Sequence, residues 1–322
     1  MMVRLRQYIA LSALTALEAL RQPIALILLT CCVLFMGLLP LVLTHTMGES
    51  EKLVRDSVLA LHFVCGLFVG SLAASASLTH ELRRGTAAAV LAKPVGRELF
   101  FFAKFSGVCV LVLLFSYAAL LAGLLSTRTA SIAYQIDPYA VAVIPVAVLL
   151  AYLLAGALNL LLRKPFVSNA FGYTLLFLTL GFLLSSFFDR EGHTVAFAQE
   201  VPWELVPAAL LVTLAVLLLT AIAVSLATRL GTVATLSICS IVLLLGLMSD
   251  YLFGRHTGDS FTARILYALL PNWQHFWTAD AISHDLAISP TYIGRVAGYA
   301  FFYLVGVLGL GIVSFRHKEI PA

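Results

Sequence analysis

Charged residues are scarce in this chain. They make up 11% of its 322 residues, whereas 61% are hydrophobic, and the mean hydropathy is +1.01. Soluble domains carry about 25% charged residues. A chain with so few cannot cover a water-exposed surface, so a soluble globular domain is excluded. The composition predicts an integral membrane protein.

Several motifs that carry chemistry are missing. The five cysteines lie inside apolar runs without a CxxC pair, which argues against a disulfide framework or a zinc site. His80-Glu81 lacks the second histidine of HExxH, and the chain has no Gly-Lys pair, so a Walker A loop is impossible. No basic run with interleaved aromatics indicates nucleic acid. We therefore expect no catalytic, metal or cofactor site in this chain, and any ATP hydrolysis must come from a partner.

Ionisable residues are almost absent from the centres of the apolar runs. His62 and Asp250 are expected near the outer ends of their helices, and Lys104, Arg163 and Arg229 near inner ends, where long side chains reach the interface. Proton relays and ion-coupled carriers need ionisable groups at mid-membrane depth. The pattern argues against a secondary transporter and weakens the case for an enzyme acting on lipid within the membrane.

Long apolar stretches are what the sequence does contain. A spanning helix needs about 20 mostly apolar residues. The eight candidates are 24–43, 57–79, 98–125, 139–162, 168–188, 204–228, 231–252 and 291–315. The sequence thus predicts an all-α fold, with residues 1–322 forming a single polytopic membrane domain.

Two segments outside these spans are expected to lie on the membrane surface. Residues 1–22 have apolar positions at helical spacing and precede Pro23, which predicts an amphipathic helix in the cytoplasmic interface. Residues 253–290 are rich in aromatics and interrupted by Pro271. They predict two short amphipathic helices at the outer interface, where Tyr267, Trp273 and Trp277 suit the aromatic belt. This connection is either an interfacial cap or an external gate or docking site.

The distribution of Lys and Arg near the span ends predicts the orientation. With the N-terminus inside, thirteen lie on the cytoplasmic side and seven on the other, which favours an N-in, C-in topology. The cytoplasmic set is Arg4, Arg6, Arg21, Arg83, Arg84, Lys93, Arg97, Lys104, Arg163, Lys164, Arg229, Arg316 and Lys318. The outer set is Lys52, Arg55, Arg128, Arg190, Arg255, Arg264 and Arg295.

Small residues recur at a spacing that allows helices to approach closely. Gly66 and Gly70 share one face of the second span, and Gly294 and Gly298 share one face of the last. The spacing indicates contact with a neighbouring helix without identifying it.

Between spans two and three lies the segment HELRRGTAAAVLAKPVGRELFFFAK, residues 80–104. Residues 81–92 are good helix formers, and Pro94 ends the helix they predict. Gly85 permits close approach of another backbone. The predicted topology places residues 80–97 in the cytoplasm as a short coupling helix. A positive-inside loop without a partner would explain its cations, but not the spacing of its other residues.

This spacing resembles that of ABC-2 type permeases, the transmembrane subunits of many bacterial ABC exporters. Their segment follows the pattern E-x-x-x-G-T, a small or apolar helix, P-V-x-R and then K-x-x-G. The matching residues are Glu81, Gly85, Thr86, Pro94, Val95, Arg97, Lys104 and Gly107. Two features depart from the family: Ala88 stands where an acid is usual, and eight spans are counted where six are common.

The resemblance implies a bacterial cytoplasmic-membrane exporter in which a separate cytosolic ABC ATPase binds ATP and Mg²⁺. Two ATPase copies and a second permease protomer are implied, because each chain has one coupling segment. The residues implied in ATPase coupling are Glu81, Arg83, Arg84, Gly85, Thr86, Pro94, Arg97 and Lys104. The alternative from another class is a non-transporting membrane scaffold that binds a cytosolic partner through the same loop. The apolar span centres favour a lipid-like or amphipathic substrate, or a path formed between two protomers.

Overall fold

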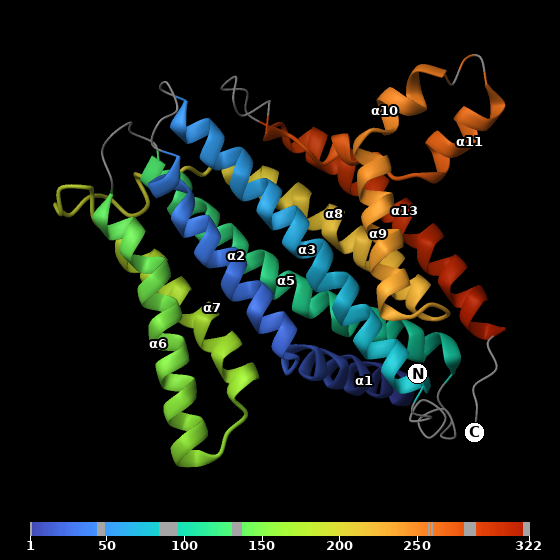
Figure 1. The fold of residues 1–322 in the computed structure, drawn as a ribbon, viewed down its shortest axis with the longest axis horizontal. Coiled ribbons are helices and arrows are strands. Elements are labelled where there is room, and N and C mark those ends of the chain that lie inside the picture. The colour runs from blue at the N-terminus through green and yellow to red at the C-terminus, as the bar shows by residue number, and fades with distance from the viewer. Residues whose placement is uncertain are drawn as a thin grey trace.

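The computed structural model describes residues 2–43, 49–83, 96–130, 137–256, 258, 260–279 and 288–317, with residues 79–83 described by their backbone only. Helices dominate the described chain, and its strand content is limited to an isolated bridge between Phe188 and Thr194. The helices form a slanted bundle with α1 lying across one end (Figure 1). We call this end the α1 end and the opposite one the α11 end.

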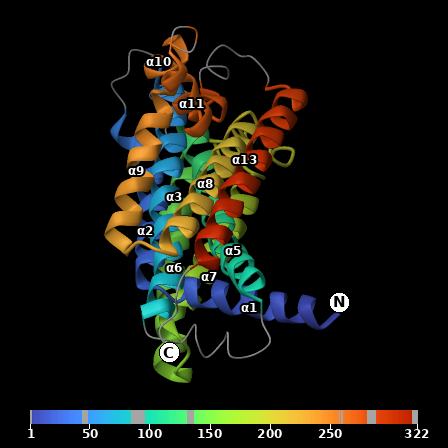
Figure 2. The ribbon, with the colours of Figure 1, turned by 90° about the vertical axis from the view of Figure 1, so that its right-hand side faces the viewer.

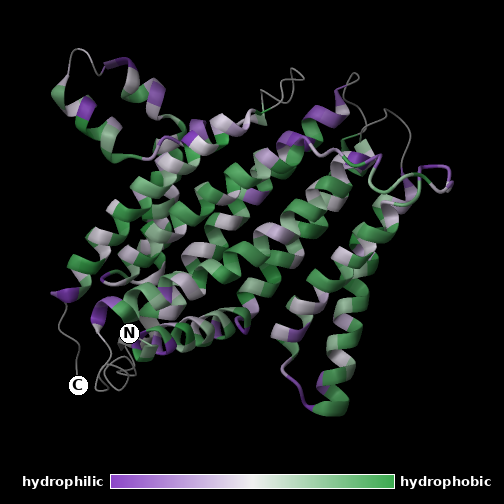
Figure 3. Ribbon diagram, turned by 180° about the vertical axis from the view of Figure 1, so that it is seen from behind, coloured by the Kyte–Doolittle hydropathy of each residue, from purple (hydrophilic) through white to green (hydrophobic). Residues whose placement is uncertain are grey.

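Seven helices are long and apolar enough to cross a membrane. They are α2 (Pro23–Val42), α3 (Ser50–Arg83), α5 (Arg97–Ala130), α6 (Pro138–Leu162), α7 (Phe166–Ser185), α8 (Leu205–Ala227) and α13 (Pro290–Arg316). Polar residues gather at the two ends of the bundle, and apolar ones fill its length (Figure 3). The fold is therefore that of a multi-span membrane protein, as the composition predicts.

The expected seventh span, 231–252, is a bent helix pair in the structure, and it counts as an eighth span if the pair is taken as one. α9 (Thr232–Leu247) has 16 residues, and the chain then bends by 66° into α10 (Ser249–Leu252). At 1.5 Å per residue, α9 is about 24 Å long, short of the ~30 Å hydrocarbon core. Two carbonyls in the second half of α9 accept hydrogen bonds from side chains of a distant turn. The Trp273 indole N–H donates to Val242 O (3.1 Å), and Gln274 Nε2 donates to Leu247 O (3.1 Å).

The connection after α10 is described in part, and residues 257, 259 and 280–287 lie outside the described residues. Its described residues contain the α-helix α11 (Phe261–Leu269), flanked by the 3₁₀ turns η1 (Gly254–His256) and η2 (Trp273–His275), and the second helix predicted there remains a prediction. Trp273 is fully buried rather than part of an aromatic belt, because its ring lies against Gly246 and meets Phe63 edge-on at 5.7 Å. The segment before Pro271, α11, is one of the predicted amphipathic helices. The turn after Pro271 packs against the bundle through the buried Trp273.

Two helices form the centre of the bundle together with α5. α3 and α8 run side by side, and Gly66 and Gly70 of α3 make this approach possible. A Cβ at Gly66 would lie 2.7 Å from Val216, and one at Gly70 would overlap Thr220. The small-residue spacing of the second span therefore serves contact with α8.

The helix predicted over residues 1–22 is α1 (Met2–Leu20), which lies across the long helices at the base of the bundle (Figure 2). Its small residues Thr15, Ala16 and Ala19 are buried, and its larger apolar residues Leu5 and Ile9 are exposed. Small side chains thus make the protein contact, and an apolar face is left free to lie in a membrane interface.

The two sets of cations separate as the sequence predicts. Within the described residues, the set assigned to the cytoplasm lies at the α1 end and the other set at the α11 end. The first described helix, α1, and the end of the last, α13, both lie at the α1 end (Figure 1). Which end faces the cytoplasm remains a prediction.

Accessibility of inserted tags tests that orientation. A tag at Gly258, which is exposed at the α11 end, should react with an impermeant label in intact spheroplasts. A tag at Arg163–Lys164, between α6 and α7, should react only after the membrane is opened. The reverse pattern would contradict the predicted topology.

Candidate functional site

The predicted coupling segment begins and ends in described helices. α3 continues to Arg83, so the backbone of Glu81 and Arg83 forms its last turn, and α5 starts at Arg97. Arg84, Gly85, Thr86 and Pro94 lie outside the described residues. What the structure does reveal is the framework that receives the segment: the ends of α3, α5 and α13, together with α1.

Arg97 and its neighbour fasten the start of α5 to the end of α13. Arg97 Nη1 donates to the carbonyl of Arg316 (2.8 Å), where a cation meets the negative end of the α13 dipole. The Arg316 guanidinium in turn pairs with the Glu98 carboxylate, and both side chains are about half exposed. Such pairs contribute about 0–1 kcal/mol each because water screens them. These contacts position the start of α5 against the end of α13 more than they add to the stability of the fold.

Apolar and polar contacts continue this junction inward. Phe100 stacks on Phe315 with centroids 6.0 Å apart, and both rings are buried. Arg229, just beyond α8, donates from Nε to Ser314 Oγ and from Nη2 to Ser314 O, each at 2.8 Å. The ends of α5, α8 and α13 therefore form one joined unit at the point where α5 begins.

Lys104 and Gly107 hold α1 against this unit. The nearly buried Lys104 ammonium lies 3.6 Å from Glu18 Oε2 of α1 and 5.6 Å from the centre of the Phe100 ring. A Cβ at Gly107 would lie 2.5 Å from Thr15 Cβ and 2.7 Å from Ser12 O. Contact with α1 thus explains the K-x-x-G part of the motif. Lys104 and Gly107 pack against this chain itself and would act on a partner only through α1.

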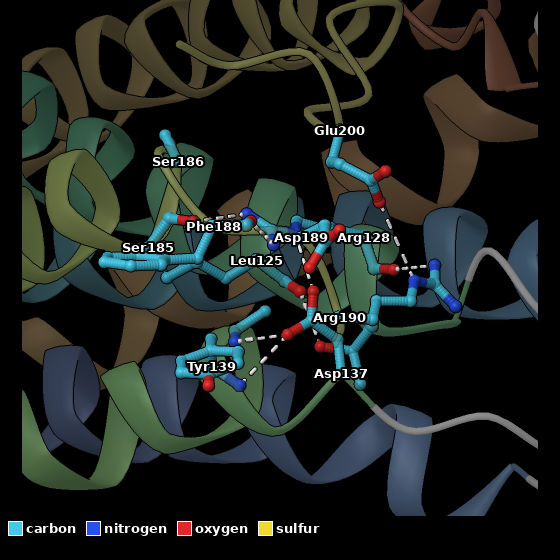
Figure 4. A network of polar contacts seen from close by, with 12 residues as sticks. Leu125, Arg128, Asp137, Tyr139, Ser185, Ser186, Phe188, Asp189, Arg190 and Glu200 are labelled. Carbon is cyan, nitrogen blue, oxygen red and sulfur yellow. Dashed lines mark hydrogen bonds and ion pairs between the residues drawn. The ribbon is translucent and has the colours of Figure 1, made fainter. Parts of the chain in front are cut away.

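Figure 4 shows a second polar cluster, at the α11 end, whose pairing the sequence did not reveal. Arg128 of α5 and Asp137, the N-cap of α6, form an ion pair of 2.8 Å with both side chains buried. Arg128 also donates to Ser185 O (2.9 Å) and Phe188 O (2.7 Å) at the end of α7. Arg190 Nη2 donates to Arg128 O (3.0 Å).

Every member of this cluster is used to join elements. Asp137 Oδ1 accepts from the backbone N–H groups of Tyr139 (3.0 Å) and Ala140 (2.9 Å), and Arg190 Nε lies 3.8 Å from Glu200 Oε2. The cluster ties α5, α6, α7 and the 186–204 loop together. It is a structural clamp, because a buried ion pair and its hydrogen bonds hold separate elements together.

The depth of His62 is a further correction. The sequence placed it near an outer end of its helix. In the structure its neighbour Leu61 lies level with the middle of α2, because the Leu61 carbonyl accepts from Cys32 Sγ (4.0 Å) and Cys32 lies midway along α2. His62 is 2% exposed, its ring lies 6.2 Å from that of Phe115, and its Nε2 has no hydrogen-bond partner in the described structure. His62 lies deeper in its helix than predicted because α3 begins at Ser50, seven residues before the predicted start of the span. A single histidine beside a phenyl ring still makes no proton relay.

Within the described residues, no group of three or more His, Cys, Asp or Glu side chains could hold a metal ion. Comparison with known proteins adds no further guide: no family model, no curated protein and no solved structure matches the chain.

The role of Gly107 can be tested by adding one methyl group. Gly107→Ala should push α1 away from α5 and lower the free energy of unfolding by about 1–3 kcal/mol, as overpacking does. The measurement is the thermal midpoint in detergent, together with proteolysis of residues 1–22.

Gly156→Ala is the matched control, because a Cβ at Gly156 of α6 meets nothing within 4 Å in the described structure. Equal behaviour of the two variants would contradict the close packing of α1.

The Arg128–Asp137 clamp predicts a different pattern. Asp137→Ala removes the carboxylate from the buried Arg128 guanidinium and should cost roughly 3–5 kcal/mol. Replacing both partners (Arg128→Met with Asp137→Leu) should recover part of that loss, because the buried charge is gone but the Ser185 and Phe188 carbonyls and the α6 N-cap lose their side-chain partners. Glu200→Ala, which removes a longer and more exposed pair, should cost about 1 kcal/mol or less. Thermal midpoints in detergent compare the three. A double variant as unstable as Asp137→Ala would contradict this account.

Proposed function

We propose that this chain is the transmembrane subunit of an ATP-driven exporter of the ABC-2 type, working with a separate ATPase at residues 80–97. The observation that carries the proposal is the set of offsets from Glu81 through Gly85-Thr86, Pro94 and Arg97 to Lys104 and Gly107. The segment connects two long membrane helices at the end of the bundle predicted to be cytoplasmic.

The surroundings of the segment support a coupling role. It joins α3 and α5, whose apolar stretches are 61% and 67% buried within the chain, against 28% for α6 and α7. A displacement of residues 84–95 would therefore act on the centre of the bundle. Because α5 is joined to α1, α8 and α13 at this end, those helices would move with it, as in rigid-body domain closure.

The absence of a Gly-Lys pair supports a separate ATPase, since no Walker A loop exists in this chain. ATP and Mg²⁺ would be bound there, and this chain would convert closure of two ATPase copies into movement of its helices. Glu81, Arg83, Arg84, Gly85 and Thr86 would make the contact. Pro94 and Arg97 would set the return into α5, and Lys104 would pass the movement to α1.

One helix offers a surface for the second protomer that this mechanism needs. α13 is 22% buried in its apolar stretch, the lowest of the seven spans. Added Cβ atoms at Gly294, Gly298, Gly306 and Gly309 meet nothing within 4 Å in the described part of the chain. Faces of this kind allow another membrane helix to pack closely. A bacterial cytoplasmic membrane is the proposed location.

Replacement of Gly85 tests the coupling role. Gly85→Trp should prevent the close approach of the proposed ATPase subunit and reduce its stimulation roughly tenfold or more, the range of a typical coupling energy. ATP hydrolysis is measured with both subunits in nanodiscs, and membrane insertion is checked by tag accessibility.

Arg163→Trp is the control, because Arg163 is exposed between α6 and α7 at the same end of the bundle. Unchanged stimulation by Gly85→Trp would contradict the coupling assignment. Binding that depends on Gly85 without any effect on ATP turnover would favour the membrane-scaffold alternative.

A further inference from the structure

Two cavities lie beside the bend between α9 and α10. One, of about 600 Å³, lies between α3, α9 and η2, and the other, of about 500 Å³, lies between α10, η1 and α11. Gln274 lines both. Each volume is within the range of small-ligand sites. A molecule that fills both must have two chemically different parts, because the two linings differ.

The larger cavity is apolar and reaches the flank of the bundle. Besides Gln274, its lining is Ala60, Phe63, Val64, Leu243, Leu247 and Trp277. Ala60, Val64 and Leu247 are also exposed on the outer surface of the described chain. In a membrane that flank faces lipid tails, so an acyl chain can enter sideways without crossing a polar region.

The smaller cavity carries both signs of charge. Asp250 and Arg255 line it with Tyr251, Gly254 and Tyr267. Among the described residues, both hydrogen bonds to Asp250 fall on Oδ1, from Tyr267 Oη and Asn272 Nδ2, each at 2.8 Å. The Tyr251 ring supports the exposed Arg255 guanidinium at 4.6 Å.

Tyr267 keeps its proton in this arrangement. Its hydrogen bond to Asp250 and its partial burial raise the pKa of the phenol above the ordinary value. It therefore donates to the carboxylate throughout the neutral range. An anionic acceptor and a guanidinium on one wall complement a headgroup that bears an ammonium and a phosphate.

We propose that the bend between α9 and α10 binds one phospholipid with an ammonium and a phosphate in its headgroup. The ammonium lies at Asp250, the phosphate at Arg255, and one acyl chain in the apolar cavity below Gln274. The depth agrees, because the apolar helix α9 ends at Leu247 and polar residues follow at the α11 end (Figure 3). This site does not depend on the proposed ATPase.

Titration of the purified full-length chain with phosphatidylethanolamine and phosphatidylglycerol, followed by native mass spectrometry, tests the headgroup assignment. The unmodified chain should prefer phosphatidylethanolamine by roughly tenfold, the effect of one charge-assisted hydrogen bond. Asp250→Asn should abolish this preference, and Arg255→Gln should weaken binding of both lipids. Asp250→Asn keeps the Oδ1 acceptor for Tyr267 and Asn272, so the fold should persist.

Two matched controls accompany these variants. Asp189→Asn removes a carboxylate from the 186–204 loop, and Arg264→Gln removes an exposed guanidinium from α11 that does not line the cavity. Both should bind like the unmodified chain. Equal affinity for the two lipids in the unmodified chain, or loss of preference in the controls, would overturn the headgroup assignment.

The acyl chain is tested separately with phosphatidylethanolamine brominated on its tails, which quenches tryptophan on contact. Ala60→Phe fills the apolar cavity from its exposed side and should reduce quenching of Trp277, whereas Ala157→Phe, on the exposed face of α6, should not. Glycerophosphoethanolamine, which has no tails, should fail to displace the lipid at equal concentration. Displacement by it, or equal quenching in both variants, would show that the apolar cavity is not used.

Discussion

The structure depends on one constraint: a polar group surrounded by hydrocarbon must find its hydrogen-bond partner within the protein. For the backbone this requires helices, and the described chain departs from helix mainly at the two ends of the bundle. For side chains it requires pairing at those ends. Lys104 reaches Glu18 at the α1 end, and Arg128 reaches Asp137 at the α11 end. Each pair also joins separate elements, so the same constraint that limits charge sets how the helices are held together.

Each end of the bundle has its own set of joined helices. At the α1 end, α1, α5, α8 and α13 meet around Phe100, Phe315 and Gly107 and form a connected base next to the predicted coupling segment. At the α11 end, the Arg128 clamp holds α5, α6 and α7, while the bend after α9 opens two cavities. Under the proposed coupling role, movement imposed at the base would pass through α3 and α5, two of the three central helices, toward the other end.

Features that follow from local composition could be predicted from the sequence. Hydropathy located the spans within a few residues, except that α3 extends seven residues before its predicted start, and Pro23 correctly separated α1 from α2. The features that failed depend on tertiary contact. Nothing in the apolar run 231–252 marks the break at Met248, because the carbonyls before it are taken by Trp273 and Gln274 from a distant turn.

In the candidate site too, local sequence was predictable and tertiary contact was not. The spacing of Lys104 and Gly107 was visible in the sequence, but their contact with Glu18 and Thr15 required the packing of α1 on α5. Glu18, the acid of α1, was the available signal that α1 could pair with a cation of another helix. A direct measurement of the central claim is photo-crosslinking in intact cells from a benzophenone amino acid at Ala88, with Arg163 as the reference position. The account predicts that Ala88, and not Arg163, crosslinks to a subunit containing a Walker A loop. Crosslinks from Ala88 only to lipid or to this same chain would contradict it.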